Sequence, residues 1–325
     1  MSSADAIVVV GAAGFIGRAL ARQLAAAGQK VVAAVRHPVA LGDGITVAAL
    51  GEIGAATDWA PLFAGARAVV HLASRAHQPL GIAPPHWIDE EVAAGAALAR
   101  AAAAARLERV VLLSSIKVLG EGTADRAYRA GQSPAPEDEY GLAKWSLETA
   151  METALRDGPT LTVLRPPLVF GPGVKANFLA LLRLVDRGLP LPLAAVKNQR
   201  SLVSLDNLVD LIATVLDHPD AGGTFLVRDD EEISTPELVR RIAHALGRPA
   251  RLFPCPPAVL RGAARLAGRG DAIEKLLGSL RIDDGATRHR FAWQPRVAFD
   301  DALAATCRWY RERDAAERGP AASAS

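Results

Sequence analysis

The chain of 325 residues is 50% hydrophobic and 22% charged, a globular composition that excludes a largely disordered protein. Its net charge of +2 is too balanced to predict a nucleic-acid-binding or membrane-surface protein. Its two cysteines, Cys255 and Cys307, are too few for a disulfide framework and lack metal-ligand spacing. No apolar run reaches ~18 residues and the N-terminus lacks signal-peptide features, so we expect a cytoplasmic protein without a membrane span.

The first half of the chain alternates short apolar runs with helical segments. Apolar runs that predict strands cover residues 7–10, 30–35, 68–73, 109–114 and 161–165. One helix is expected between a glycine-rich turn and Gly28, and another at residues 90–106, whose alanines predict close packing against its neighbours. Strands that alternate with helices of this length predict βαβ units, and hence an α/β fold with a doubly wound parallel sheet.

The pattern changes after about residue 171. Helices are predicted at residues 177–188, 206–218, 235–247 and 256–268, with short extended pieces such as residues 224–227 between them. We therefore expect a first domain at residues 1–173, a smaller and mostly helical second domain at 174–312, and a flexible tail at 313–325. Whether the chain crosses back from the second domain into the first stays open.

The glycine-rich turn Gly11-Ala-Ala-Gly14-Phe15-Ile16-Gly17 joins the first strand to the first helix. Glycines at such a turn let backbone amides approach a pyrophosphate at the helix N-terminus. The spacing is G-x-x-G-x-x-G rather than G-x-G-x-x-G, and such glycines can serve a tight turn alone. Their place after the first strand of a βαβ series nevertheless predicts that residues 1–173 form a Rossmann-type domain, in which the three glycines, Phe15 and Ile16 bind a dinucleotide.

The end of the second strand bears on the choice between NAD and NADP. A carboxylate there binds the ribose diol of NAD, whereas an arginine favours the 2′-phosphate of NADP. This chain has Arg36 and no acid at that place, which favours NADP(H) over NAD. In the alternative, Arg36 is a solvated strand-end residue and NAD binds through other contacts. Glu52, after the next apparent strand, is either an adenine contact or a surface acid.

Ser115, Tyr140 and Lys144 form the candidate catalytic set. Tyr140 and Lys144 stand at i and i+4, so a helix would place them on one face. A free tyrosine has a pKa near ~10, and a nearby ammonium group would bring it toward neutral pH. A serine hydroxyl from another element could then hold a carbonyl or alcohol oxygen against the phenol. The set suits proton transfer to oxygen while a nicotinamide cofactor moves hydride to or from carbon.

Six motifs carry a resemblance to a known family: residues 11–17 (GAAGFIG), 71–74 (HLAS), 113–115 (LSS), 140–144 (YGLAK), 165–172 (RPPLVFGP) and 200–206 (RSLVSLD). With them, the chain resembles the extended short-chain dehydrogenase/reductase family of nucleotide-sugar epimerases, dehydratases and ketoreductases. Residues 115–120 and 166–178 are similar to a bacterial surface-polysaccharide branch. That branch includes UDP-glucose or UDP-N-acetylglucosamine 4-epimerase-like proteins and 4-reductases that form UDP-N-acetylquinovosamine.

The resemblance implies a role for most of the remaining candidate residues. Ser115 and Tyr140 would flank the sugar 4-oxygen, and Lys144 would also hold the nicotinamide ribose. The other implied positions are Ala73 and Ser74 along the cofactor path, Pro167 near the nicotinamide, and Asn177 and Arg200 at the nucleotide diphosphate. For Asn177 a helix cap is the alternative, and for Arg200 an ordinary surface position. Lys117, which follows the active-site serine, is a further candidate for contact with the sugar or a phosphate.

The chain departs from the family pattern at two informative places. Dehydratases of the family carry an Asp-Glu pair directly after the active-site Ser or Thr, so Ile116-Lys117 argues against 4,6-dehydration. Leu168 stands where several epimerases have a substrate-contacting asparagine, which weakens a UDP-galactose-type epimerase. His71 and His77 have no nearby acid or thiol, so we expect no metal site and a packing role for His71.

These observations favour a 4-ketoreductase of a UDP-4-keto-6-deoxy sugar in polysaccharide biosynthesis. The substrate would be a UDP-sugar and the cofactor NADP or NAD, and the resemblance implies a homodimer. Three alternatives stay open. They are a UDP-glucose or UDP-N-acetylglucosamine 4-epimerase, a non-catalytic dinucleotide-binding regulator, and a reductase of a small carbonyl compound.

Overall fold

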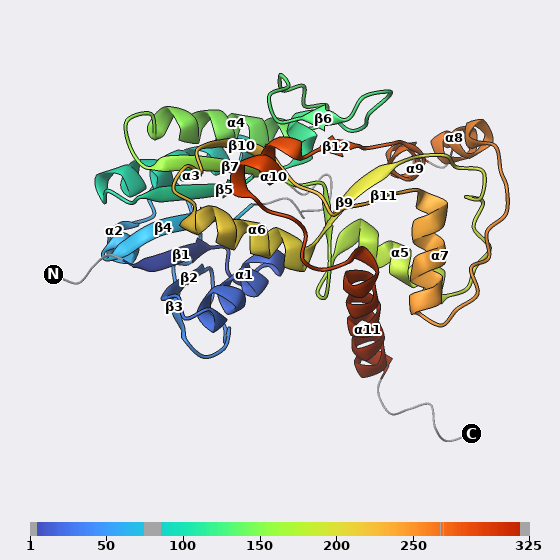
Figure 1. The fold of residues 1–325 in the computed structure, drawn as a ribbon, viewed down its shortest axis with the longest axis horizontal. Coiled ribbons are helices and arrows are strands. Elements are labelled where there is room, and N and C mark those ends of the chain that lie inside the picture. The colour runs from blue at the N-terminus through green and yellow to red at the C-terminus, as the bar shows by residue number, and fades with distance from the viewer. Residues whose placement is uncertain (1–4, 75–85, 267, 269, 319–325) are drawn as a thin grey trace.

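The computed structural model describes residues 5–74, 86–266, 268 and 270–318. Its main sheet is parallel, with the strand order β10-β7-β5-β4-β1-β2-β3 (Figure 1). The strands are β1 (Ala6–Val10), β2 (Val31–Val35), β3 (Ile45–Ala49), β4 (Ala66–His71), β5 (Arg109–Leu113), β7 (Thr160–Arg165) and β10 (Gly223–Leu226). The order reverses between β1 and β4, and ligands of open α/β sheets bind outside the carboxyl ends of strands at such a switch point.

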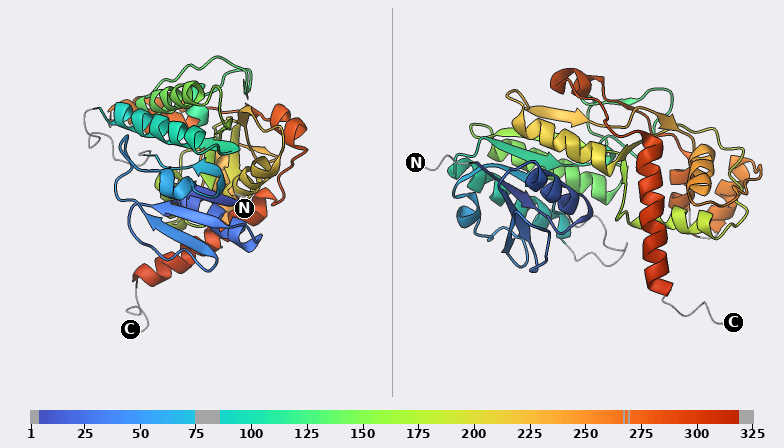
Figure 2. Two further views of the ribbon diagram at one scale, coloured as in Figure 1. Left: turned by 90° about the vertical axis from the view of Figure 1, so that its left-hand side faces the viewer. Right: turned by 60° about the horizontal axis from the view of Figure 1, so that its bottom comes forward.

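Alternate residues of β1 enter two separate cores. Ile7 and Val9 pack into the core that contains α1 (Phe15–Ala26) and α6 (Leu205–Asp217). Val8 and Val10 pack into the core that contains α2 (Ala60–Phe63), α3 (Trp87–Ala104) and α4 (Glu139–Ala154). Successive side chains of a strand point to opposite faces, so this continuous apolar strand lies between two helical layers (Figure 2). The predicted doubly wound α/β fold is confirmed.

The chain crosses back into the first domain after residue 204. Helix α6 packs against α1, and β10 pairs with β7 so that Phe225 lies opposite Leu164. Phe291, the last residue of α10 (Gly285–Phe291), packs in the same core as α6. The region predicted as a second domain, residues 174–312, is therefore interrupted. Most of the extended piece predicted at residues 224–227 is a strand of the main sheet.

The second part of the fold surrounds a small sheet with helices. In this sheet β8 (Leu168–Phe170) is parallel and β11 (Glu232–Ile233) antiparallel to β9 (Arg200–Ser204). The helices are α5 (Ala176–Asp186), α7 (Thr235–Ala245), α8 (Pro257–Leu266), α9 (Gly270–Leu277) and α11 (Phe299–Arg318). Phe170 stacks on Phe178 and contacts Phe299 in their shared core. This part is mostly helical, as the sequence predicted.

The sequence analysis predicted no helix at the C-terminal end, where the structure has α11. Helix α11 continues to Arg318, so a tail does not begin at residue 313, and residues 319–325 lie outside the described part of the chain. A short pairing of β6 (Tyr128–Arg129) with β12 (Ile282–Asp283) ties the loop before α4 to the C-terminal region. Within the described ranges, no helix is both long enough and apolar enough to cross a membrane.

Gly95 lets α3 and α4 pack closely, in line with the small side chains of the predicted helix at residues 90–106. A Cβ atom on Gly95 would lie 2.1 Å from Cδ1 of Leu147. We expect Gly95→Val to lower the free energy of unfolding by about 1–3 kcal/mol, because the new side chain overpacks this contact. Ala93→Val, on the exposed side of α3, is the matched control. Equal urea-unfolding midpoints for the two variants would contradict this prediction.

Candidate active site

The glycine turn joins β1 to α1, beside the switch point between β1 and β4. Gly11 has a φ of +85°, and a Cβ on it would lie 2.8 Å from the backbone nitrogen of Ala73. A Cβ on Gly17 would lie 2.3 Å from the carbonyl oxygen of Gly11. Gly14 caps α1 without a side-chain hydrogen bond, so the amides of the first turn stay available. Neither Gly11 nor Gly17 has room for a Cβ, so the turn stays tight, and its free amides fit the pyrophosphate of a dinucleotide.

Phe15 and Ile16 open α1 and pack against the core beneath it. Phe15 also contacts the core of the second part, and a Cβ on Gly173 would lie 3.3 Å from its ring. The two residues therefore join the glycine turn to both parts of the fold. Their predicted contact with the cofactor stays a prediction.

Arg36 directly follows β2, where the 2′-position of the adenosine ribose is expected. Its Nε lies 3.2 Å from Oε1 of Glu52, and both side chains are mostly exposed. An exposed pair of this kind is weak and readily rearranged. The sequence has no acid at the end of the second strand, but the fold places the carboxylate of Glu52 beside Arg36 at that position.

Helix α4 brings the predicted catalytic residues together. Asp138 caps the helix, because its Oδ1 accepts the backbone N–H of Gly141 at 2.7 Å. Lys144 follows Tyr140 on the same face, with Nζ 5.8 Å from the centroid of the tyrosine ring. Ser115, just beyond β5, is hydrogen-bonded to the phenol of Tyr140. Tyr140 and Lys144 thus lie on one face of a helix, as their i, i+4 spacing predicted.

Lys144 is buried and paired with an acid that the sequence analysis missed. Its Nζ lies 3.1 Å from Oε1 of Glu91 on α3, and the two side chains are only 2% and 7% exposed. Ser74, predicted along the cofactor path, donates its hydroxyl to the same oxygen at 3.0 Å. Burial lowers the pKa of Lys144, whereas the charge of Glu91 raises it. In the sequence, Glu91 follows Asp89 and Glu90 and resembles ordinary charges on a helix surface.

The pKa of Tyr140 lies above its ordinary value, contrary to the prediction that Lys144 lowers it. Burial is the largest cause, the charge of Glu91 adds to it, the hydrogen bond with Ser115 opposes it, and Asp138 raises it further. The main physical reason is burial, because a low-dielectric surrounding disfavours the charged phenolate, and the negative charge of Glu91 acts in the same direction. The phenol is therefore protonated at neutral pH.

His71 ends β4 beside the Lys144–Glu91 pair. Burial and then Lys144 lower the pKa of His71 to about 4, while Glu91 raises it, so the imidazole is neutral near pH 7. Its Nδ1 has no hydrogen-bond partner among the residues that the structure describes. This buried position agrees with the predicted packing role. His77 lies outside the described residues.

A second buried acid holds α4 against the sheet, and the sequence analysis missed it too. Glu148, one turn beyond Lys144, accepts hydrogen bonds from Nε of Arg165 at 3.0 Å and from its terminal nitrogen at 2.5 Å. Both side chains are 4% exposed. Glu148 also accepts the hydroxyl of Ser114. This two-point pairing ties α4 to the ends of β5 and β7.

Pro167 and Ala73, both predicted beside the cofactor, follow β7 and β4. Pro167 is buried, and the neighbouring carbonyl of Pro166 accepts the N–H of Ile116 at 3.0 Å. This bond joins the connection after β7 to the loop that carries Ser115. The candidate residues thus gather where the carboxyl ends of β1, β4, β5 and β7 meet, the ligand-binding edge of such a sheet.

Lys117 belongs to a cluster of charges next to Tyr140, the predicted catalytic tyrosine. Its Nζ lies 2.5 Å from Oε1 of Glu121, contacts the carboxylate of Asp138, and lies 5.9 Å from the centroid of the Tyr140 ring. Burial lowers the pKa of Lys117, but the two acids outweigh it and the net direction is upward. Lys117 is therefore a firmly charged group at the edge of the site.

Arg200 lies in β9 and points toward the end of α9. Its guanidinium donates to the carbonyl oxygens of Lys275 at 2.7 Å and Gly278 at 3.0 Å. Burial lowers the pKa of Arg200 and the charge of Glu121 raises it, which links Arg200 to the cluster around Lys117. Asn177 is exposed in the first turn of α5 and is not its cap, because the N-cap is Lys175. Contact of Arg200 and Asn177 with a diphosphate stays a prediction.

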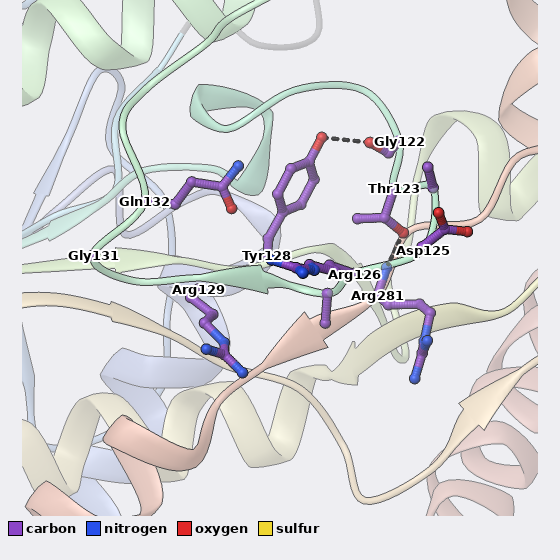
Figure 3. A pocket seen from close by; sticks show the side chains of 11 residues that line it. Gly122, Thr123, Asp125, Arg126, Tyr128, Arg129, Gly131, Gln132 and Arg281 are labelled. Carbon is purple, nitrogen blue, oxygen red and sulfur yellow. Dashed lines mark hydrogen bonds between the residues drawn. The ribbon is translucent and has the colours of Figure 1, made fainter.

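An open cavity of about 1170 Å³ adjoins Glu121. It is lined by residues 122–129, 131, 132 and Arg281, and Figure 3 shows the Tyr128 phenol donating to the carbonyl of Gly122 at 2.5 Å. None of the three predicted catalytic residues lines it. The cavity is therefore a feature of the loop before α4 and is separate from the predicted catalytic residues.

A glycine cradle at the switch point of a parallel sheet, with a serine, a tyrosine and a lysine beside it, defines the class of nicotinamide-dependent enzymes of the short-chain dehydrogenase/reductase type. The sequence profile of the NAD dependent epimerase/dehydratase family matches residues 7–227. The chain belongs to this family, as the resemblance predicted.

Similar proteins extend this comparison to the whole chain. UDP-glucose 4-epimerase of Vibrio cholerae is 37% identical over 312 residues, which cover 92% of this chain and 94% of that protein. The crystal structure of a putative epimerase from Burkholderia cenocepacia J2315 has a TM-score of 0.78 at 21% identity, covering 96% of this chain and 100% of that one. MoeE5 in complex with UDP-glucose and NAD has a TM-score of 0.73 at 24% identity, with the same coverage. The two solved structures share the fold of this chain.

The cradle predicts the effect of adding one methyl group. Gly17→Ala should weaken binding of the dinucleotide by at least about 10-fold, because the new Cβ forces the turn open where the pyrophosphate is expected. Isothermal titration calorimetry measures this affinity. Gly54→Ala is the control, since nothing lies within 4 Å of its Cβ position. Unchanged binding by Gly17→Ala would show that the pyrophosphate lies elsewhere.

Proposed function

We propose that the protein transfers hydride at C4 of a UDP-hexose or UDP-N-acetylhexosamine, acting as a 4-epimerase. The observation that carries this proposal is its 37% identity, over 92% of its length, with UDP-glucose 4-epimerase of Vibrio cholerae. This similarity spans both the sheet and the helical second part. Ser115, Tyr140 and Lys144 supply the groups that proton transfer at the sugar oxygen requires.

Tyr140 would exchange the proton of the sugar 4-oxygen, and Ser115, which is hydrogen-bonded to the same phenol, would hold that oxygen within reach. Lys144 would orient the nicotinamide ribose. The bound cofactor would supply the hydride acceptor and donor for C4. In a 4-epimerase the keto sugar has to turn within the site and be reduced on its other face, so the cofactor stays bound. In a reductase it is exchanged after each turnover.

Arg200, Lys117 and Asn177 would hold the sugar nucleotide. Arg200 is fixed by two carbonyl groups at the end of α9, and a guanidinium group has further donors for a diphosphate. Lys117 already shares its charge with Glu121 and Asp138. It is therefore better suited to a sugar hydroxyl than to a second anion.

A 4-ketoreductase of a UDP-4-keto-6-deoxy sugar, which the sequence alone favoured, is the second candidate. Arg36 supports it, because a reductase uses NADPH and an arginine after β2 suits the 2′-phosphate. Ile116-Lys117 argues against a dehydratase in either case. A non-catalytic regulator has less support, since all three candidate catalytic residues lie together.

The predicted homodimer is retained as part of this proposal. The resemblance implies an interface formed by two helices, one of which carries Tyr140. Leu142 on α4 is 46% exposed, and it is an apolar side chain that such an interface would cover.

Incubation with UDP-glucose or UDP-N-acetylglucosamine, without added reductant, tests the proposed reaction. We expect the 4-epimer to appear in the NMR spectrum, and Tyr140→Phe to reduce kcat about 10²- to 10⁴-fold because the proton-transferring hydroxyl is lost. Binding of the dinucleotide to this variant should be unchanged. Stoichiometric oxidation of NADPH by a 4-keto sugar, without any epimer, would replace the epimerase by the reductase. Full turnover by Tyr140→Phe would reject the role of the phenol.

Arg36 predicts a preference for NADP(H) that a second pair of variants tests. Arg36→Ala should weaken NADPH binding about 10- to 100-fold, the equivalent of one charge-assisted hydrogen bond, and change NADH binding little. Glu52→Gln should strengthen NADPH binding, because it frees the guanidinium. Fluorescence titration of the reduced nicotinamide measures both affinities. An equal loss for the two cofactors in Arg36→Ala would show that Arg36 does not bind the 2′-phosphate.

A further inference from the structure

Lys117, Glu121 and Asp138 form a charged cluster beside the phenol that the proposed function assigns to proton transfer. Nζ of Lys117 lies 2.5 Å from Oε1 of Glu121 and also contacts Oδ2 of Asp138. The centroid of the Tyr140 ring is 5.9 Å from the same nitrogen. The three side chains are 24%, 28% and 36% exposed, so water screens them only in part. A sugar whose 4-oxygen meets the phenol would therefore lie next to this Lys117 cluster.

Local packing holds the backbone around the Lys117 cluster. Oδ1 of Asp138 accepts the N–H of Gly141 at 2.7 Å, which leaves its other oxygen for Lys117. A Cβ on Gly141 would lie 2.6 Å from the carbonyl oxygen of Lys117, so the start of α4 lies directly against the loop that carries the lysine. The backbone N–H of Glu121 donates to Oε1 of Glu137 at 3.1 Å. The two acids thus stay within reach of the lysine.

Two carboxylates outnumber the single ammonium group of this cluster. If both acids are ionised, the cluster has an excess of negative charge, and if one is protonated, the cluster is neutral. In neither state does it offer a net positive charge to an anionic group on the sugar. Among the residues that the structure describes, Lys144 is a second cation near the ring, with Nζ 5.8 Å from its centroid, and it is already paired with Glu91.

We propose that Glu121 and Asp138 make the site selective for nucleotide sugars whose sugar ring carries no charge, so that a UDP-hexuronic acid is rejected. C6 of a hexose is two bonds from C4, so a carboxylate at C6 would lie near the 4-oxygen and the Lys117 cluster. Like charges brought together in a partly buried site oppose binding. A hydroxymethyl or methyl group at C6 meets no such repulsion, and the hydroxyl can donate to either acid.

This selectivity rests on the proposed function, because it requires that the sugar of a UDP-sugar lies beside Tyr140. It applies equally to the 4-epimerase and to the 4-ketoreductase, since a hexose and a 6-deoxy sugar are both uncharged at C6. Arg200, which the proposed function assigns to the diphosphate, would then bind the anionic part of the substrate. The charge of Glu121 also acts on Arg200, and this effect is the same for every UDP-sugar.

The affinities for UDP-glucose and UDP-glucuronic acid test the proposal, because the two ligands differ only at C6. Isothermal titration calorimetry measures both, with saturating NAD or NADP, whichever binds more tightly, and with Tyr140→Phe to prevent turnover. We expect UDP-glucose to bind about 10- to 100-fold more tightly, as one repulsive contact between like charges would produce. Glu121→Gln removes the charge and keeps an acceptor for Lys117, and should reduce this preference at least about 5-fold.

Glu139→Gln is the matched control, because it makes the same charge change at an exposed residue in the first turn of α4. It should leave the ratio of the two affinities unchanged. Equal effects of Glu121→Gln and Glu139→Gln on that ratio would overturn the proposal. Equal affinities of the Tyr140→Phe protein for the two ligands would also overturn it, and this result does not depend on the folding of a Glu121 variant.

The same titrations separate failure of this selectivity from failure of the proposed function. If neither ligand bound, the proposed function would be rejected and the selectivity with it. If both bound equally well and the unmodified protein converted UDP-glucose to its 4-epimer, the proposed function would stand and only the selectivity would be rejected.

Discussion

Two buried acid–base pairs fix the helix on which the whole site depends. Tyr140, Lys144 and Glu148 occupy successive turns of α4, and the latter two pair with α3 and β7. Removing one partner of a buried pair destabilises a protein by about 3–5 kcal/mol, so α4 cannot rotate or slide without a large loss. The contacts that stabilise the fold therefore also set the distance between the phenol and the glycine turn.

The two parts of the fold meet at this same edge of the sheet. Phe15 packs in both cores, and the charge of Glu121, in the loop before α4, acts on Arg200 in β9. The β6–β12 pairing ties that loop to the C-terminal region. A sugar nucleotide held between Arg200 and Tyr140 would thus contact both parts at once, and its reacting carbon would be placed by groups from each.

Local patterns in the sequence predicted what depends on local spacing. The strands, the glycine turn and the face shared by Tyr140 and Lys144 follow from residues a few positions apart. The sequence analysis missed Glu91 because its burial results from the approach of α3 to α4. Next to Asp89 and Glu90, the local sequence does not distinguish this buried acid from an exposed one. Helix α11 passes residue 313 because Ala, Glu and Arg favour a helix, although the composition of residues 313–325 suggested a tail. The strand that pairs with β10 is β7, about 60 residues earlier in the chain, and no local pattern within residues 224–227 predicts this pairing.

The return of the chain through α6 and β10 has a consequence for synthesis on the ribosome. Until residue 226 has emerged, β7 is an open sheet edge and the apolar face of α1 lacks the helix that covers it. The nascent N-terminal half therefore exposes an unpaired strand edge and apolar surface, and such an intermediate is prone to aggregation and is a typical chaperone substrate. Residues 174–312 also include α6 and β10, which belong to the core of the first domain. Exchanging this segment between relatives by recombination would therefore disrupt the packing of that domain.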